Sequence, residues 1–162
     1  WNWEAVIGAN ANGFFPYTSP TNLLYGLAEA LRLLGEEGMD RVYARHARLG
    51  AATRVAVQSW GLETVCRQPG RHSNSLTALL MPDGIDADEV RKVALENFNL
   101  SLGTGLGKLA KKAFRIGHIG DFNDLMLTGT LTGVEMALDM AGVKIQKGGV
   151  SAAMKFLQEN GK

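Results

Sequence analysis

The chain has 162 residues, of which 46% are hydrophobic and 20% charged, so it is long enough to bury the core of one compact domain. Its 17 basic residues nearly balance 16 acidic ones and form no basic cluster, which argues against a nucleic-acid partner. The single cysteine, Cys66, excludes an internal disulfide and a multi-cysteine zinc site, so we expect a reducing, cytoplasmic location. Because no apolar run approaches roughly 20 residues, no membrane partner is expected.

The first part of the sequence, residues 1–22, is rich in glycine, asparagine, proline and aromatic residues and has no sustained period. This composition predicts an extended segment. The sequence starts without a basic region or a methionine, and we expect its first residue to be an internal point of a longer protein. A helix should follow, with Ser19 or Thr18 as its cap and Pro20 in its first turn, because leucines then recur at helical spacing as far as Gly35.

A second helix is predicted from about Met39 to Trp60, with Gly61 as its stop. Residues 23–61 are therefore interpreted as two connecting helices between the extended segment and a small α/β domain, residues 62–162.

The pattern changes within residues 62–162. Short β-prone segments are predicted at residues 63–67, 75–81, 99–103 and 113–117. Helices with one apolar face are predicted at residues 86–98, 121–142 and 150–160. Together these elements indicate an α/β fold, in which a small mixed or antiparallel sheet is covered by helices.

A glycine-rich link, residues 103–108, ends in Gly-Lys and so invites comparison with a phosphate-binding loop. Such a loop needs a glycine five residues before the Gly-Lys pair, where this chain has Leu102. It also needs serine or threonine after the lysine, where this chain has Leu109. We therefore expect a flexible loop near a pocket rather than a nucleotide site.

The other residues with reactive side chains give no signature of a metal or nucleophile site. The three histidines, His46, His72 and His118, lack paired metal-ligand spacing, so no metal is predicted. His118 is interpreted as structural. Cys66 has no histidine nearby in its strand-like segment and is expected to be a small core residue.

Arg115 is the sharpest candidate for a binding residue. It lies in a β-prone run, where alternation should point it opposite to Phe114 and Ile116. A long cation on an otherwise apolar element needs a partner, and the planar guanidinium group matches the two oxygens of a carboxylate. That partner could be a ligand, or it could be Asp121 or Asp124 in a structural ion pair. The residues alone leave both interpretations open.

Longer motifs point to a known family. Residues 114–127 (FRIGHIGDFNDLML), 101–108 (SLGTGLGK) and 13–25 (GFFPYTSPTNLLY) resemble the C-terminal part of the serine–glyoxylate aminotransferases. These belong, with the alanine–glyoxylate aminotransferases, to the class V enzymes that depend on pyridoxal 5'-phosphate. The resemblance implies the C-terminal small domain of a fold-type I homodimer whose active sites lie at the subunit interface.

The resemblance also implies roles for two residues. Arg115 would bind the α-carboxylate of the amino acid or of glyoxylate, and Thr18 would bind the cofactor phosphate of the neighbouring subunit. Where alanine–glyoxylate enzymes have a phosphate-binding tyrosine, this chain has Phe15, which lacks the hydroxyl group.

The resemblance implies that no catalytic residue lies in this chain. The family's cofactor-binding lysine precedes the matched region, and Lys108, Lys111 and Lys112 do not match it. We therefore expect the C-terminal portion of an aminotransferase that converts serine and glyoxylate to hydroxypyruvate and glycine, inactive when alone. The alternatives are a non-catalytic domain for small-anion binding or protein interaction, and an aminotransferase of the same group that uses alanine or a phosphonate.

Overall fold

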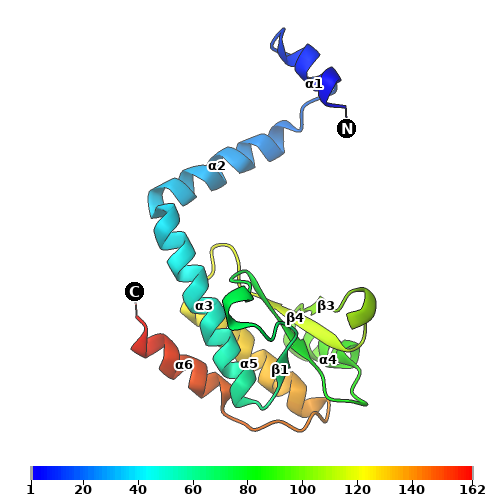
Figure 1. The fold of residues 1–162 in the computed structure, drawn as a ribbon, viewed down its shortest axis with the longest axis vertical. Coiled ribbons are helices and arrows are strands. Elements are labelled where there is room, and N and C mark those ends of the chain that lie inside the picture. The colour runs from blue at the N-terminus through cyan, green and yellow to red at the C-terminus, as the bar shows by residue number, and fades with distance from the viewer. Residues whose placement is uncertain (1, 162) are drawn as a thin grey trace. The chain divides into compact units, whose positions relative to one another are not determined.

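The computed structural model describes residues 2–161, which fall into two compact units that divide between residues 42 and 43 (Figure 1). The first unit contains α1 (Trp3–Asn10), α2 (Thr21–Glu37) and the start of α3 (Met39–Ser59). The second contains the rest of α3, then β1 (Glu63–Thr64), β2 (Leu76–Leu80), α4 (Ala87–Phe98), β3 (Gly103–Thr104), β4 (Ala113–Gly117), α5 (Asp124–Met140) and α6 (Gly149–Glu159), with single 3-10 turns at Pro69–Arg71 and Gly107–Leu109. In the described part of the chain, no helix is long and apolar enough to cross a membrane.

The beginning of the chain differs from the predicted extended segment. Helix α1 forms there because the side chain of Asn2 accepts hydrogen bonds from the backbone amides of Glu4 and Ala5, which caps the first turn. The predicted cap of α2 is also wrong. Pro20 occupies the cap position with φ −76°, so Ser19 and Thr18 lie too far upstream to cap the helix with their hydroxyl groups.

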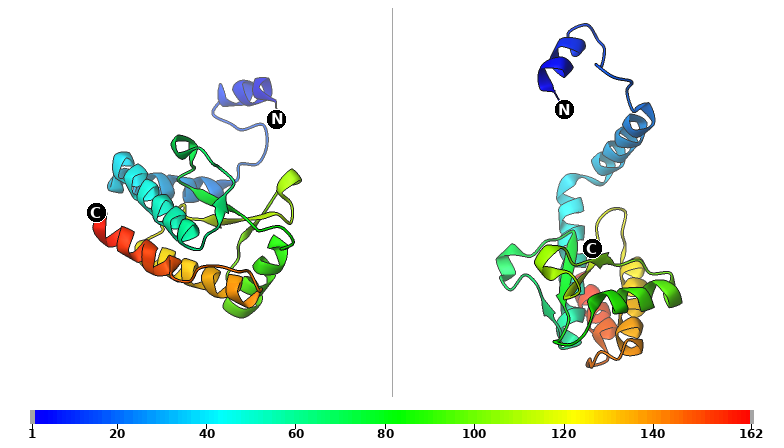
Figure 2. Two further views of the ribbon diagram at one scale, coloured as in Figure 1. Left: turned by 60° about the horizontal axis from the view of Figure 1, so that its bottom comes forward. Right: turned by 90° about the vertical axis from the view of Figure 1, so that its right-hand side faces the viewer.

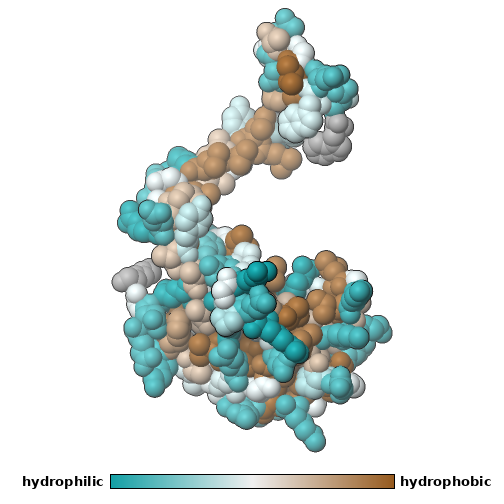
Figure 3. Space-filling view, viewed as in Figure 1, coloured by the Kyte–Doolittle hydropathy of each residue, from teal (hydrophilic) through white to brown (hydrophobic). Residues whose placement is uncertain are grey.

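Helix α2 has an apolar face that its own unit does not bury. No residue of α1 or α2 is buried, and the side chains of Leu23, Leu27 and Leu31 are more than half exposed. Hydrophobic residues gather along α2 in the surface view (Figure 3). The helical leucine spacing is confirmed, but it does not form a core within this unit.

The second unit is built on an antiparallel sheet of order β1-β2-β4-β3. One face carries Leu79, Phe114 and Ile116, which are completely buried. Helices α4 and α5 pack against each other over this face, and α6 lies against α5 (Figure 2). The predicted small sheet covered by helices is thus confirmed, and its strand pairs are all antiparallel.

Two local predictions in this unit are wrong. The predicted strand at 99–103 is limited to Gly103–Thr104, because Asn99 adopts a left-handed conformation (φ 51°) that ends α4. Cys66 is not a core residue. It follows the two-residue strand β1 on a half-buried loop, where its thiol contacts the carbonyl of Gln68.

Glu135 on α5 links the end of α3 to the start of α6. Its carboxylate accepts hydrogen bonds from Trp60 Nε1 at 2.6 Å and from the amides of Gly148 and Val150 at 3.2 Å each. Burial alone would raise the pKa of this carboxyl group, but these hydrogen bonds favour the charged form and leave the pKa below its usual value. Gly149 is required beside it, because an added Cβ would lie 2.2 Å from Trp60 Nε1.

Candidate functional site

Arg115 stands in the middle of β4 with its side chain on the open face of the sheet. Phe114 and Ile116 are fully buried on the opposite face, which confirms the predicted alternation. Its direct partners in the sheet are Ala78 on β2 and Gly103 on β3. Because paired residues share one face, the small side chain of Ala78 and the absence of one at Gly103 leave room for the guanidinium group.

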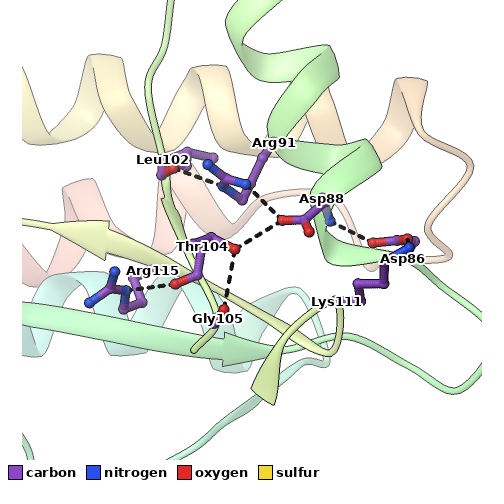
Figure 4. Close-up of polar contacts among 8 residues, drawn as sticks. All are labelled: Asp86, Asp88, Arg91, Leu102, Thr104, Gly105, Lys111 and Arg115. Carbon is purple, nitrogen blue, oxygen red and sulfur yellow. Dashed lines mark hydrogen bonds and ion pairs between the residues drawn. The ribbon is translucent and has the colours of Figure 1, made fainter. Parts of the chain in front are cut away.

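One nitrogen of the guanidinium group is committed to the protein. Arg115 Nε donates a hydrogen bond of 2.9 Å to the carbonyl of Thr104 (Figure 4). Within residues 2–161, neither Nη1 nor Nη2 has a hydrogen-bond partner, and no carboxylate lies at ion-pair distance. The structural ion pair with Asp121 or Asp124 is therefore absent. Asp124 instead pairs with Arg48, through contacts of 2.5 and 3.1 Å.

Gly103 forms one wall of the space in which Arg115 lies. A Cβ added to Gly103 would lie 3.1 Å from Arg115 Nε and 3.2 Å from its Cβ, closer than such atoms usually approach. A side chain at position 103 would therefore press on the arginine side chain at its Cβ and at its Nε.

Residues of α4 hold the strand on which Gly103 lies. The hydroxyl group of Thr104 donates to Asp88 Oδ1 at 3.1 Å, and Arg91 Nη1 donates to the same oxygen at 2.7 Å. Arg91 Nε also donates to the carbonyl of Leu102 at 2.8 Å. The hydrogen bond from Arg91, helped by Thr104, holds the pKa of Asp88 below its usual value. Asp88 therefore stays charged at neutral pH and continues to accept both bonds.

The glycine-rich link folds back tightly on itself, and its predicted flexibility stays a prediction. Gly105 is buried, and an added Cβ would lie 2.1 Å from the carbonyl oxygen of Leu109, so the chain folds tightly on itself. Backbone hydrogen bonds then form the 3-10 turn that follows Gly105. At its end, Lys111 has a left-handed conformation (φ 64°), and its amine lies 3.2 Å from Asp86 Oδ2. The link thus supports β3 rather than forming a phosphate cradle.

Thr18, the second candidate residue, lies in the first unit on the loop between α1 and α2. Its side chain is exposed, and in the part of the chain that the structure describes its hydroxyl group has no hydrogen-bond partner. Phe15 and Tyr17 on the same loop are also exposed. The loop can therefore offer a hydroxyl donor to a group outside this chain.

The histidines have structural surroundings. His118 is completely buried, with Nδ1 3.1 Å from the carbonyl of Asn74 and Nε2 3.0 Å from the hydroxyl of Thr77. This pattern favours a neutral ring that donates from Nδ1 and accepts at Nε2. Burial lowers the pKa of His118 to about 4, and the nearby charge of Arg54 acts in the same direction. This burial and these two contacts agree with the structural interpretation of His118, which stays a prediction.

His46 and His72 lie apart from any cluster of ligands. His46 Nε2 accepts a hydrogen bond from the amide of Gly120, and His72 Nε2 lies 3.0 Å from the carbonyl of Cys66. Among the described residues there is no group of three acidic, histidine or cysteine side chains that could hold a metal ion.

Sequence reasoning found Arg115 but missed the residues around it. Asp88 and Arg91 lie within the helix predicted at residues 86–98, but no pattern in the sequence singled out their side chains. Their contacts with Thr104 and Leu102 join elements that are separate in the sequence. The one available signal was Gly103, because a glycine beside an arginine on an adjacent strand indicates a close approach.

Comparison with solved structures defines the class of protein. The chain matches pyridoxamine–pyruvate aminotransferase from Mesorhizobium loti with a TM-score of 0.85 and 31% identity, over 91% of this chain and 38% of that one. It matches ureidoglycine–glyoxylate aminotransferase from Bacillus subtilis with a TM-score of 0.82 and 29% identity, over 88% and 37%. The fold is that of the C-terminal part of the aminotransferases. No family model matches the chain.

Sequence comparison gives the particular group. The chain is 51% identical over 160 residues to serine–glyoxylate aminotransferase from Methylorubrum extorquens, and 49% identical over 148 residues to that of Arabidopsis thaliana. These matches cover 98% and 91% of this chain, but only 40% and 37% of the relatives. The chain is a homologue of the C-terminal part of the serine–glyoxylate aminotransferases, and its neighbours among solved structures are class V aminotransferases. It spans about 40% of the length of the curated relatives that it matches.

Proposed function

We propose that this chain is the substrate-carboxylate-binding portion of an aminotransferase that moves the amino group of serine to glyoxylate, giving hydroxypyruvate and glycine. The observation that carries the proposal is the free Nη edge of Arg115, a charged fork without a carboxylate partner in the described residues. Amino acid and keto acid substrates both carry a carboxylate beside the reacting carbon, so one arginine can serve both half-reactions. Similarity to serine–glyoxylate enzymes supports the choice of substrates.

The contacts of Arg115 restrict how a carboxylate would bind. Because Nε donates to the carbonyl of Thr104, the ligand would meet the guanidinium group end-on, through Nη1 and Nη2. Two parallel hydrogen bonds would fix both the position and the plane of the carboxylate. The bond to be broken at the neighbouring carbon would then have a defined direction, so Arg115 contributes orientation rather than proton transfer.

We propose pyridoxal 5'-phosphate as the cofactor, which when bound supplies an electron sink and carries the amino group between substrates. The free hydroxyl group of Thr18 suits a phosphate oxygen, as a donor from the neighbouring subunit of a homodimer. One hydroxyl group is too little to hold a phosphate, so the remaining ligands belong to parts of the protein outside this chain. A cytoplasmic location fits the single, unpaired cysteine.

The division of the chain follows from these roles. Residues 1–22 would be the segment from the large domain that carries Thr18, residues 23–61 the connecting helices, and residues 62–162 the small α/β domain that carries Arg115.

The test of the carboxylate role is Arg115→Ala in the protein that carries this chain. Both kcat/KM values, for the amino donor and for glyoxylate, should fall by an amount equivalent to about 2–3 kcal/mol of transition-state binding, because a charge-assisted pair is lost. Arg115→Lys should be intermediate, since it keeps the charge but not the fork. Arg67→Ala removes an exposed arginine paired with Glu63 and serves as the control. Unchanged kcat/KM for both substrates would contradict the proposal.

A second measurement tests whether covalent cofactor chemistry lies outside the chain. The 162-residue chain, mixed with pyridoxal 5'-phosphate and treated with borohydride, should show no stoichiometric labelling of a single lysine. Lys108, Lys111 and Lys112 should each react only as exposed surface amines do. Peptide mapping by mass spectrometry gives the result, and full labelling at one lysine would overturn the proposed inactivity of the isolated chain.

A further inference from the structure

We propose that Gly103, Thr104 and the Asp88–Arg91 pair position Arg115, so that the guanidinium group is held with only its Nη edge available to a carboxylate. This inference rests on the proposed function, since it concerns how the same arginine is aimed. The residues named do not contact the substrate themselves; they act through Arg115.

The first interaction that positions Arg115 is the hydrogen bond from its Nε to the Thr104 carbonyl. An arginine side chain has several rotatable bonds, and an exposed one adopts many conformations. A bond at Nε fixes the plane of the group while leaving the outer edge free, and in Figure 4 the Nη atoms point away from Thr104. The orientation of the Arg115 guanidinium group therefore depends on the position of the Thr104 carbonyl.

The second element is the anchoring of that carbonyl. Strand β3 has only two residues and pairs only with β4, so sheet hydrogen bonds alone hold it weakly. Helix α4 adds hydrogen bonds to the residues on both sides of Gly103. Arg91 binds the carbonyl of Leu102, and Asp88 binds the hydroxyl of Thr104. The residues before and after Gly103 are each fixed to the helix, and the 2.7 Å contact between Asp88 and Arg91 joins the two anchors.

The third element is the missing side chain at position 103. A Cβ at this position would lie 3.1 Å from Arg115 Nε and 3.5 Å from Cζ, so the guanidinium group lies directly against the backbone of β3. Since both neighbours of Gly103 are anchored to α4, we expect the arginine rather than the strand to shift when a methyl group is added. Its bond to the Thr104 carbonyl would then be strained.

The experiment measures carboxylate binding in the full protein, as the inhibition constant of propionate against the amino donor. Gly103→Ala should weaken propionate binding roughly tenfold, and Thr104→Val roughly threefold, because misplacement by a fraction of an ångström impairs a two-point contact. Thr104→Ser keeps the hydroxyl group and should restore binding to within about twofold of the original. KM should rise for both substrates, while the absorbance of the bound cofactor and its affinity stay the same.

Matched controls come from α5. Gly129→Ala adds a methyl group at an exposed helical glycine with nothing within 4 Å, and Thr132→Val removes an exposed hydroxyl that bonds only within its helix. Neither should change propionate inhibition. Thermal melting shows whether each variant folds. If Gly103→Ala does not fold, the comparison of Thr104→Val with Thr104→Ser tests the positioning role.

A double-mutant cycle separates the positioning role of Gly103 from the carboxylate-binding role of Arg115. If Arg115→Ala weakens propionate binding and Gly103→Ala has no further effect in that background, the two residues act as one unit and the positioning role is supported. If Gly103→Ala and Thr104→Val leave propionate binding unchanged while Arg115→Ala weakens it, the positioning role is wrong and the proposed function stands. If Arg115→Ala itself has no effect, the carboxylate role fails, and the positioning role with it.

Discussion

The two units of the chain are held together in different ways. Residues 43–162 surround a continuous core that includes the fully buried side chains of Trp60, Phe114 and Leu131. Helices α1 and α2 of the first unit bury none of their residues, although α2 has a regular apolar face. The second unit buries its apolar side chains in its own core, whereas the apolar face of α2 in the first unit is left exposed. Helical periodicity thus reports that a face will be covered, but not by what.

The same contrast applies to the candidate residues. Arg115 is supported by packing, by Thr104 and by the anchors on α4, all within its own unit. Thr18 is an exposed loop residue without a hydrogen-bond partner among the described residues. We therefore expect the geometry of Arg115 to be a property of the second unit and that of Thr18 to depend on its binding partner.

The largest effect that would sharpen this contrast is expected from Trp60→Ala. This change removes a fully buried indole and its bond to Glu135, and should destabilise the second unit by about 3–5 kcal/mol. Hydrogen exchange of the β4 amides in the protein that carries this chain measures the loss. A loss below about 1 kcal/mol would show that the core is not organised around this residue.

A smaller effect is expected from acid, through His118. Its folded-state pKa of about 4 lies below the ordinary value of 6.5, so the unfolded chain takes up a proton first as the pH falls. Stability should therefore be complete above pH 6.5 and decline between pH 6.5 and 4, by about 3 kcal/mol. The β4 amide exchange, measured across this range and corrected for intrinsic rates, follows the change. The non-titrating variant His118→Asn should show a flatter dependence, and identical slopes would contradict the assignment.

The smallest effect is expected from Leu27→Ala on α2. Since Leu27 is 54% exposed, this change should alter the stability of the second unit by less than about 0.5 kcal/mol, again read from the β4 amides. A loss comparable to that of Trp60→Ala would break the distinction between the units, because it would show that α2 contributes to the core of the second.

Features that depend on neighbouring residues in the sequence were predicted better than features that depend on distant ones. Alternation correctly placed Arg115 opposite Phe114 and Ile116, because that pattern is a local property of a strand. The strand expected at 99–103 was wrong because the left-handed turn at Asn99 satisfies the end of α4 instead. Cys66 was wrongly placed in the core, since a two-residue strand does not carry its side-chain pattern into the following loop.

The candidate site was predictable only in part for the same reason. The arginine could be identified from its neighbours and from the family motif. Its support could not, because Asp88 and Thr104 are 16 residues apart and meet only when α4 packs beside β3. No carboxylate pairs with Arg115 among the described residues, so the sequence pattern could not name a partner, and only the resemblance to known aminotransferases suggested one.

The carboxylate of Glu135 has a consequence for which side chains the fold can accept. Three N–H donors, from Trp60, Gly148 and Val150, converge on its two oxygens, and none of these groups can accept a hydrogen bond in return. Glutamine has the same shape, but its NH2 group would face one donor with another. Aspartate is one methylene shorter and would not reach all three. Position 135 therefore requires a long side chain that only accepts, which makes a seemingly ordinary acidic residue on α5 as constrained as a buried core position.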